Sequence, residues 1–395
     1  FNHIVPKVEN WKNELSWVGK DGLIVFDDTG YGAIQSKLRA QGYKVFGGSK
    51  GGDRLENDRE YSQEIFAQCG LKTKETKDFE TIFDAIEYVK ENPKVWVIKQ
   101  NGHGAKDINY VGHFKDGRDV LSVLRTYATN EKINKQKITL QEKIEGIEIG
   151  VGRYFNGTDW VGPIELNVEH KKFFPGDIGP TTSEMGTVAW YTSNEKNKLF
   201  REVLAPLKET LQKIDYRGDF EINCIVNKAG AFPLEATPRF GSPIIHLHSE
   251  LHKSPWGEFL SAVADGKPYN LKWKKGFGIV VVLAVPPFPY SKKDKNQNLF
   301  GVNIFFNKIK ASDYSHFHFE EMSRSLENPN QYYISDGRGY VMYVTAVSKT
   351  LQKAKSSVYT LIKKIIIPKL IYRNDIGERF ITKDYSQLKK WGYIE

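Results

Sequence analysis

The stretch that decides the fold is residues 219–241, DFEINCIVNKAGAFPLEATPRFG. Apolar and polar residues alternate in DFEINCIV and again in AFPLEA, as in half-buried strands, because successive side chains of a strand point to opposite faces. A short turn at residues 228–230 separates the two runs. The pattern therefore predicts a β-hairpin.

Acids lie on both arms of this hairpin. Glu221 shares a face with Asn223 on the first arm, and Glu235 shares a face with Thr237 on the second. If the register lets these faces meet, two carboxylates converge as Mg²⁺ needs when it bridges nucleotide phosphates. Without a cation, like charges side by side disfavour strand pairing. Arg239, just after the second arm, is placed to clamp a phosphoryl oxygen.

Upstream of the hairpin the pattern is that of an α/β protein. The apolar run at residues 22–27 predicts a strand, residues 33–42 a helix that stops at a glycine, and residues 43–46 a second strand. Strand, helix and strand at this spacing indicate a parallel sheet. Strands are also expected at residues 95–99, 138–144 and 149–155, and a long amphipathic helix kinked by Pro206 at residues 199–214.

Composition restricts the class of protein. With 395 residues, 40% hydrophobic and 27% charged, the chain is long and apolar enough for several cores, which excludes a disordered chain. The longest apolar run, residues 279–288, contains two prolines and is too short to span a bilayer. Two cysteines, Cys69 and Cys224, provide neither a disulfide framework nor a zinc cluster, which favours a reducing, cytoplasmic setting.

The net charge of +9 favours an anionic partner, either a phosphorylated small molecule or a nucleic acid, although a basic solvated face would give the same number. The chain opens with FNHIVPKVENWKNEL, without a methionine and without the regions of a signal peptide. We expect further residues upstream of Phe1.

Two segments fit nucleotide binding. Lys99 ends an apolar strand and enters the loop NGHGAK at residues 101–106, whose small residues would let backbone N–H groups approach phosphates. In LQEKIEGIEIG, residues 140–150, a base could bond the backbone after Glu142, and Glu148 could accept the ribose hydroxyls. Taken alone, each segment is more typical of an ordinary strand end with solvated charges than of a nucleotide site.

Taken in order, these segments resemble the ATP-grasp superfamily, and within it the glycinamide ribonucleotide synthetase (phosphoribosylamine–glycine ligase) family. The matching stretches run from about Tyr43 to Gly377: GYKVFGGSKGGDRLENDREYSQEIFAQCGLKT, VIKQNGHGAK, LQEKIEGIE, EHKKFFPGDIGPTTSEMGT, LEATPRFGSP, DGRGYVMYVTAVSKTLQKA and YRNDIG. Their order is more specific than any one motif.

The resemblance implies roles for individual residues. ATP contacts are implied for Lys99, Gly102, Gly104, Glu142, Lys143, Ile144 and Glu148. The implied metal ligands are Glu221, Glu235 and Thr237, and Lys106, Arg239, His170 and Lys171 would act in catalysis. Acceptor contacts are implied for Gly179, Pro180, Thr182 and Gly186. From the residues alone, His170 is as well explained as a structural histidine, and His246, His248 and His252 are assigned to structure.

The chain also departs from the family pattern. Thr237 replaces the asparagine that is the family's second metal ligand, and the acceptor loop reads GPTTSEMG, with Ser183 and Glu184 in place of a glycine pair. The phosphate loop is shorter, and Ser242 replaces an aspartate. Most of the family's N-terminal domain is not seen before Phe1.

The resemblance implies an ATP-grasp fold of α/β and α+β units. We expect a truncated N-terminal Rossmann-like domain at residues 1–50, an ATP-grasp domain at 51–270 with a lid at about 80–145, and a small C-terminal β-rich α+β domain at 271–395. The implied activity is that of an ATP- and Mg²⁺- (or Mn²⁺-) dependent carboxylate–amine ligase of purine biosynthesis, working through an acyl phosphate.

Two alternatives stay open. One is an ATP-grasp amino-acid ligase acting on another phosphorylated or nucleotide-like amine, and the other is a nucleic-acid-binding protein that keeps an ATP-grasp shell. The expected partners are small amine and carboxylate substrates, one of them phosphorylated, with no membrane and with nucleic acid not favoured. By the resemblance, the protein is a monomer or a loose dimer.

Overall fold

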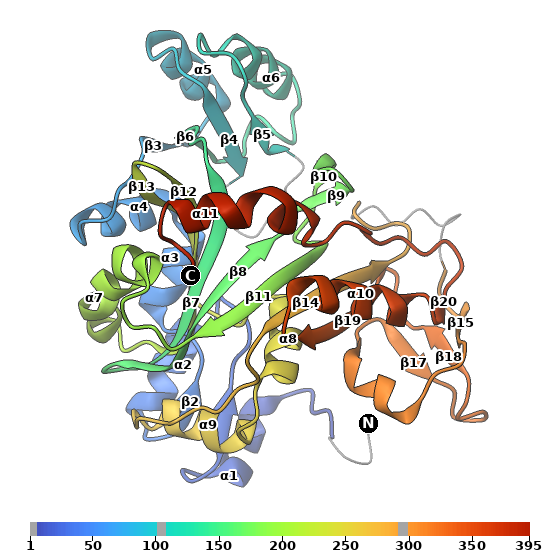
Figure 1. Ribbon diagram of the computed structural model, residues 1–395. Coiled ribbons are helices and arrows are strands. Elements are labelled where there is room, and N and C mark those ends of the chain that lie inside the picture. The colour runs from blue at the N-terminus through green and yellow to red at the C-terminus, as the bar shows by residue number, and fades with distance from the viewer. Residues whose placement is uncertain (1–5, 101–107, 291–298) are drawn as a thin grey trace.

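The computed structural model describes residues 6–100, 108–290 and 299–395. Its centre is an antiparallel eight-stranded sheet with the strand order β13-β12-β7-β8-β11-β14-β19-β16 (Figure 1). The strands are β7 (Ile147–Asn156), β8 (Trp160–Glu169), β11 (Gly186–Thr192), β12 (Arg217–Asn227), β13 (Gly230–Thr237), β14 (Phe277–Ala284), β16 (Phe317–Phe319) and β19 (Tyr340–Ser348).

Alternation along β12 divides the sheet into an apolar and a polar face. Phe220, Ile222 and Cys224 are fully buried in the main hydrophobic core. Asp219 and Glu221 lie on the opposite face, as the period of two requires. The predicted hairpin is confirmed: β12 and β13 pair in antiparallel fashion, with a tight turn at residues 228 and 229.

The N-terminal part forms the predicted strand–helix–strand unit. β1 (Leu23–Val25) and β2 (Lys44–Phe46) pair in parallel, and α2 (Gly32–Ala40) connects them. Before this unit come η1 (Trp11–Glu14) and α1 (Leu15–Val18). After it, α3 (Lys50–Asn57) and α4 (Arg59–Gln68) are capped by Ser49 and Asp58, whose side chains accept from backbone N–H groups of the first turn.

A smaller unit, the lid, lies beyond one end of the large sheet (Figure 1). Its four strands are ordered β3-β6-β4-β5, and it has a hydrophobic core of its own that includes Trp96 and Leu140. Its elements are β3 (Thr76–Phe79), α5 (Ile82–Glu91), β4 (Trp96–Gln100), β5 (Tyr110–Val111), α6 (Arg118–Ala128) and β6 (Ile138–Glu142).

The C-terminal part shares the large sheet. β14 pairs with β11, so the sheet continues across the predicted domain boundary at residue 270, and the domain limits stay predictions. A second four-stranded sheet, β17-β18-β15-β20, lies outside it. The remaining elements are β9 (Lys172–Phe174), β10 (Ile178–Thr181), α8 (Ile244–Leu251), α9 (Trp256–Ala264), β15 (Asn303–Phe306), η6 (Ala311–His316), β17 (Met322–Arg324), β18 (Tyr332–Ile334), α10 (Leu351–Ile362), β20 (Ile365–Ile366), η7 (Phe380–Asp384) and α11 (Tyr385–Lys390).

The helix expected at residues 199–214 is not one regular α-helix. The chain forms a π-helical turn η3 (Phe200–Leu204), a 3₁₀ turn η4 (Ala205–Leu207) and only then α7 (Lys208–Lys213). Pro206 explains the change, because it has no N–H to donate and its ring crowds the preceding turn. In the described part of the chain, no helix has the length and apolarity needed to cross a membrane.

The main core should respond strongly to truncation. Phe155 of β7 is fully buried there, whereas Phe305 of β15 is 55% exposed. We expect Phe155→Ala to lower the free energy of unfolding by about 3–5 kcal/mol, because it removes apolar contacts and leaves a cavity. The control Phe305→Ala should change it by less than about 0.5 kcal/mol. Urea denaturation followed by fluorescence measures both, and equal losses would contradict this account of the core.

Candidate active site

The hairpin register determines which polar side chains meet. Asn223 lies directly opposite Glu235, and Glu221 lies opposite Thr237. All four therefore share the polar face, but the two acids belong to successive pairs along the strands. The carboxylate of Glu221 accepts from Asn167 Nδ2 at 2.8 Å. The metal roles predicted for Glu221 and Thr237 stay predictions.

Lys171, which follows β8, is the hub of the polar face. Its Nζ lies 2.9 Å from Glu148 Oε1, 2.9 Å from Glu169 Oε2 and 3.1 Å from Glu235 Oε1. Burial disfavours the charge of this ammonium, but the three carboxylates outweigh burial and raise its pKa well above the usual value. Lys171 is therefore a fixed positive charge that ties β7, β8 and β13 together.

Glu235 has a second cation on its other side. Arg59, the first residue of α4, donates from Nη2 to Glu235 Oε2 at 3.0 Å. Both carboxylate oxygens of Glu235 thus face positive charge. Asn223, across the strand pair, donates from Nδ2 to Glu169 at 2.9 Å, while its buried Oδ1 has no partner among the described residues.

Lys99 enters this region from β4 of the lid. Its Nζ donates to Gln141 Oε1 on β6 at 2.7 Å. Burial, followed by the nearby charges of Arg59 and Lys171, lowers the pKa of Lys99 to about 7. Lys99, Arg59, Glu148, Lys171 and Glu235 all line one cavity of about 530 Å³, a size typical of small-molecule sites.

In the segment expected to bind the nucleotide base, some polar groups are hydrogen-bonded to other residues of the protein. Glu142 Oε1 accepts from Lys74 Nζ at 2.6 Å, and the backbone N–H of Lys143 donates to Val95 O at 2.8 Å. The side chain of Ile144 is buried. The ATP contacts of Glu142, Lys143 and Ile144 stay predictions, and Gly102, Gly104 and Lys106 lie outside the described residues.

Arg239 follows β13 but is held by a helix. Its Nε and Nη2 donate to Glu56 Oε1 of α3 at 3.1 and 2.9 Å, and its Nη1 donates to Phe240 O at 3.0 Å. This ion pair positions Arg239 beside the hairpin, and its contact with a phosphoryl oxygen stays a prediction.

Comparison with known proteins agrees with this geometry. Residues 57–244 match the family model of the phosphoribosylglycinamide synthetase ATP-grasp (A) domain. The crystal structure of phosphoribosylamine–glycine ligase from Thermotoga maritima superposes with a TM-score of 0.70 at 19% identity, covering 94% of this chain and 89% of that chain. The chain has the ATP-grasp fold.

Sequence relatives point to the same branch of the ATP-grasp proteins. Phosphoribosylamine–glycine ligase of Clostridium acetobutylicum is 27% identical over 375 residues, which are 92% of this chain and 84% of the relative. That of Halalkalibacterium halodurans is 24% identical, over 89% of this chain and 80% of the relative. A biotin carboxylase from Campylobacter jejuni has the same fold, with a TM-score of 0.61 at 11% identity, 93% coverage of this chain and 82% coverage of that chain. The predicted fold and family resemblance are confirmed.

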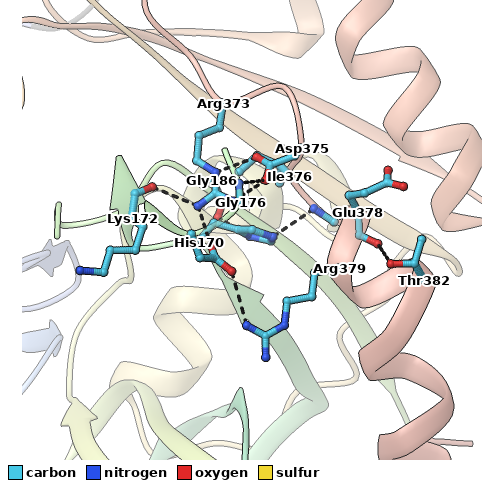
Figure 2. Close-up of polar contacts among 12 residues, drawn as sticks. His170, Lys172, Gly176, Gly186, Arg373, Asp375, Ile376, Glu378, Arg379 and Thr382 are labelled. Carbon is cyan, nitrogen blue, oxygen red and sulfur yellow. Dashed lines mark hydrogen bonds and ion pairs between the residues drawn. The ribbon is translucent and has the colours of Figure 1, made fainter. Parts of the chain in front are cut away.

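The C-terminal segment holds the turn between β9 and β10 (Figure 2). Arg373 is buried, donating to both carboxylate oxygens of Asp375 at 2.7 Å, to Asp177 at 2.8 Å and to Lys172 O at 3.0 Å. Asp375 also accepts from the backbone N–H of Gly176 at 2.8 Å. A segment some 200 residues away thus fixes the conformation of the β9–β10 hairpin.

His170 is enclosed by the same contacts. Its Nδ1 lies 3.2 Å from Gly186 O, and its Nε2 accepts from the backbone N–H of Gly377 at 3.1 Å (Figure 2). Burial, followed by the charge of Arg373, lowers the pKa of His170 to about 4. Since both ring nitrogens bond to backbone, the geometry favours the structural alternative for His170.

The other residues implied to contact the acceptor substrate are explained mainly by the backbone conformation of their loop. Gly179 has a φ of +84° and Gly186 a φ of +156°, conformations that favour glycine. Thr182 is turned inward, and its Oγ1 donates to Lys171 O at 2.9 Å. Pro180 lies in β10 between these residues. Their contacts with an acceptor stay predictions.

Sequence reasoning did not identify Arg59, Gln141 or Glu169 as part of the site. Arg59 and Glu235 are 176 residues apart, and no local pattern links a helix start to a distant strand. The histidines at 246, 248 and 252 lie in or next to α8, where His248 Nε2 lies 2.5 Å from Glu165 and His252 Nε2 lies 2.9 Å from the hydroxyl of Tyr191. Within residues 6–100, 108–290 and 299–395, no group of three or more His, Cys, Asp or Glu side chains is arranged to hold a metal by itself.

The burial of His170 predicts the pH range in which its imidazole ring takes up a proton. The unfolded imidazole binds a proton below about pH 6.5, whereas the folded one does so only below about pH 4. The unfolded state therefore binds more protons in this window, and the contribution of His170 to stability falls as the pH drops from 6.5 to 4. Nitrogen-15 histidine NMR, assigned with His170→Gln, should show a neutral ring at pH 5. A ring that is half-protonated near pH 6.5 would contradict the burial described here.

Proposed function

We propose that this chain is an ATP-dependent, ADP-forming carboxylate–amine ligase, most like phosphoribosylamine–glycine ligase. The observation that supports it is the meeting of three cations, Lys99, Arg59 and Lys171, around Glu235 in one cavity lined by the lid and the large sheet. This arrangement suits a polyphosphate, because Arg59 and Lys171 supply positive charge in advance and Lys99 can take up a proton beside them. The names of the relatives agree with this class.

The reaction has two steps. A carboxylate oxygen of one substrate attacks the γ-phosphorus of ATP, which forms an acyl phosphate and releases ADP. The amine nitrogen of the second substrate then attacks the acyl carbon, the carbon–oxygen bond to phosphate breaks, and the amine loses its proton. No protein nucleophile is needed, so positioning and charge neutralisation by Lys99, Arg59 and Lys171 carry the rate.

The residues present fit a divalent ion beside Glu235. Its carboxylate and the amide oxygen of Asn223 are hard oxygen donors on directly paired residues, and the buried Asn223 Oδ1 has no other partner among the described residues. We place Mg²⁺ or Mn²⁺ there. Such an ion, when bound, offsets charge on the β- and γ-phosphates.

A second candidate is an amino-acid ligase for a different amine. The acceptor loop favours it, because Glu184 is buried there where the resembling family has a glycine pair. Burial and the nearby Glu169 raise the pKa of Glu184 well above its usual range. ADP release measured over a panel of amino acids with phosphoribosylamine and with other amines separates the two candidates, and turnover with glycine and phosphoribosylamine alone would exclude the second.

Removal of the Glu235 charge tests the metal assignment. We expect Glu235→Gln to lower kcat for ADP release by at least roughly 100-fold, because it weakens a fixed electrostatic contact at the transferring phosphoryl group. Circular dichroism should show an unchanged fold. Glu209→Gln, an exposed change in α7, is the matched control and should retain full activity. Near-normal magnesium-dependent ADP release by Glu235→Gln would refute the assignment.

Lys99 predicts a pH dependence of nucleotide binding. With a pKa of about 7, its amine is mostly neutral above that pH, and binding the triphosphate requires it to take up a proton. The Kd for a non-hydrolysable ATP analogue should therefore rise with pH, at most roughly tenfold per unit between pH 7.5 and 9. Lys99→Met should bind more weakly at pH 7.5 and lose most of this slope. Identical slopes in calorimetric titrations of the two proteins would show that Lys99 does not meet the phosphates.

A further inference from the structure

A second group of acids lies on the polar face, one residue pair farther along the strands than Glu235. Gly152 of β7 pairs with Glu221 of β12 on one side and with Glu165 of β8 on the other. The two glutamates are only 5% and 3% exposed. The amide of Asn167 connects them, because its Nδ2 donates to Glu165 Oε1 at 2.7 Å and to Glu221 Oε1 at 2.8 Å.

The same place holds amide oxygens that lack a donor. Asn167 is fully buried, and its Oδ1 has no hydrogen-bond partner in the described part of the chain, like Asn223 Oδ1. Both asparagines pair with Gly150, one on each side. A Cβ at Gly150 would lie 2.4 Å from Asn167 Oδ1 and 2.6 Å from Glu221 Oε1, so these oxygens gather above the glycine. Buried acceptors without donors point to a ligand that donates.

The nearest guanidinium to Glu221, that of Arg239, is paired with Glu56, although the charge of Glu221 also helps to raise the pKa of Arg239. His248 lies against Glu165, and Lys171 is shared by three other carboxylates. Among the described residues, Glu221 has no ion pair with a basic side chain. Glu184 of the acceptor loop adds a further buried carboxylate, whose Oε1 lacks a hydrogen-bond partner among the described residues. A phosphate would be repelled here, whereas an organic cation would be held.

We propose that Glu221 and Glu165, with the amide oxygen of Asn167, form a subsite that binds a protonated primary amine of a substrate. An ammonium group has three N–H donors and a positive charge, which match the two buried carboxylates and the Asn167 amide oxygen that lacks a donor. The inference rests on the proposed ligase function, since the subsite adjoins the pair Asn223 and Glu235. The bound amine is not the reacting one.

Two sources of such an ammonium fit this chemistry. One is the amino group of an amino acid whose carboxylate is activated, and the other is the second ammonium of a diamine acceptor. Calorimetric titration of the full chain with Mg²⁺ and a non-hydrolysable ATP analogue distinguishes them. The probes are glycine against acetate for the first source, and 1,3-diaminopropane against 1,3-propanediol for the second.

In the wild type, either glycine should bind at least tenfold more tightly than acetate, or 1,3-diaminopropane should bind at least tenfold more tightly than its uncharged control. Glu221→Gln should remove this preference, and Glu165→Gln should reduce it, while the affinity for the ATP analogue changes less than twofold. Glu209→Gln should behave as the wild type. Glu165→Gln also removes the ion-pair partner of His248, so thermal melts of each variant check that the fold persists. If Glu165→Gln unfolds, Glu221→Gln alone tests the proposal.

Three results would overturn the subsite. They are no preference for either ammonium probe in the wild type, a preference that survives Glu221→Gln, or an at least tenfold loss of metal-dependent affinity for the ATP analogue in Glu221→Gln. The last result would make Glu221 a metal ligand instead. Failure of the ligase function has a different signature, namely no ADP release with any amino acid and amine while the ammonium preference in binding remains.

Discussion

The ammonium group of Lys171 is the contact on which the candidate site depends. It lies within 3.1 Å of carboxylates on three different strands, β7, β8 and β13. Because these acids lie so close together, each would repel the others without this charge. Lys171 therefore sets where Glu148 and Glu235 stand, and Glu235 in turn positions Arg59 at the start of α4.

The sequence predicted the framework of this site better than its contacts. Alternation in residues 219–241 was enough to predict the β12–β13 hairpin, because strand period is a local property. The register, which sets Asn223 rather than Glu221 opposite Glu235, depends on how a two-residue turn closes and on the shift after Asn223, and neither is visible in the pattern. That Lys171 belongs to the site at all was implied only by the family resemblance, which gave it a part in catalysis.

Long-range packing explains what the pattern left open. For His170 the sequence allowed a structural role and a binding role equally, and the structure favours the first because Gly377, 207 residues away, donates to its ring. The resemblance predicted a small β-rich domain at residues 271–395, but the hydrophobic pattern contains nothing about which sheet its strands join. β14 and β19 extend the large sheet, and the segment that follows brings Arg373 to the turn between β9 and β10.

The arrangement of charge on the polar face depends on Gly150 of β7. A Cβ there would collide with Asn167 and Glu221, so its absence lets Asn167 reach across β7 from β8 to Glu221 on β12. Lysine and arginine lie at the level of Glu235, whereas Glu221, which has no ion pair among the described residues, lies one pair farther on. Two residues along a strand span roughly 7 Å, so the cations around Glu235 and the acids around Glu221 occupy neighbouring but separate parts of the face. The room left by the missing side chain is a stronger reason for Gly150 than backbone freedom, since β7 pairs regularly with β12 there.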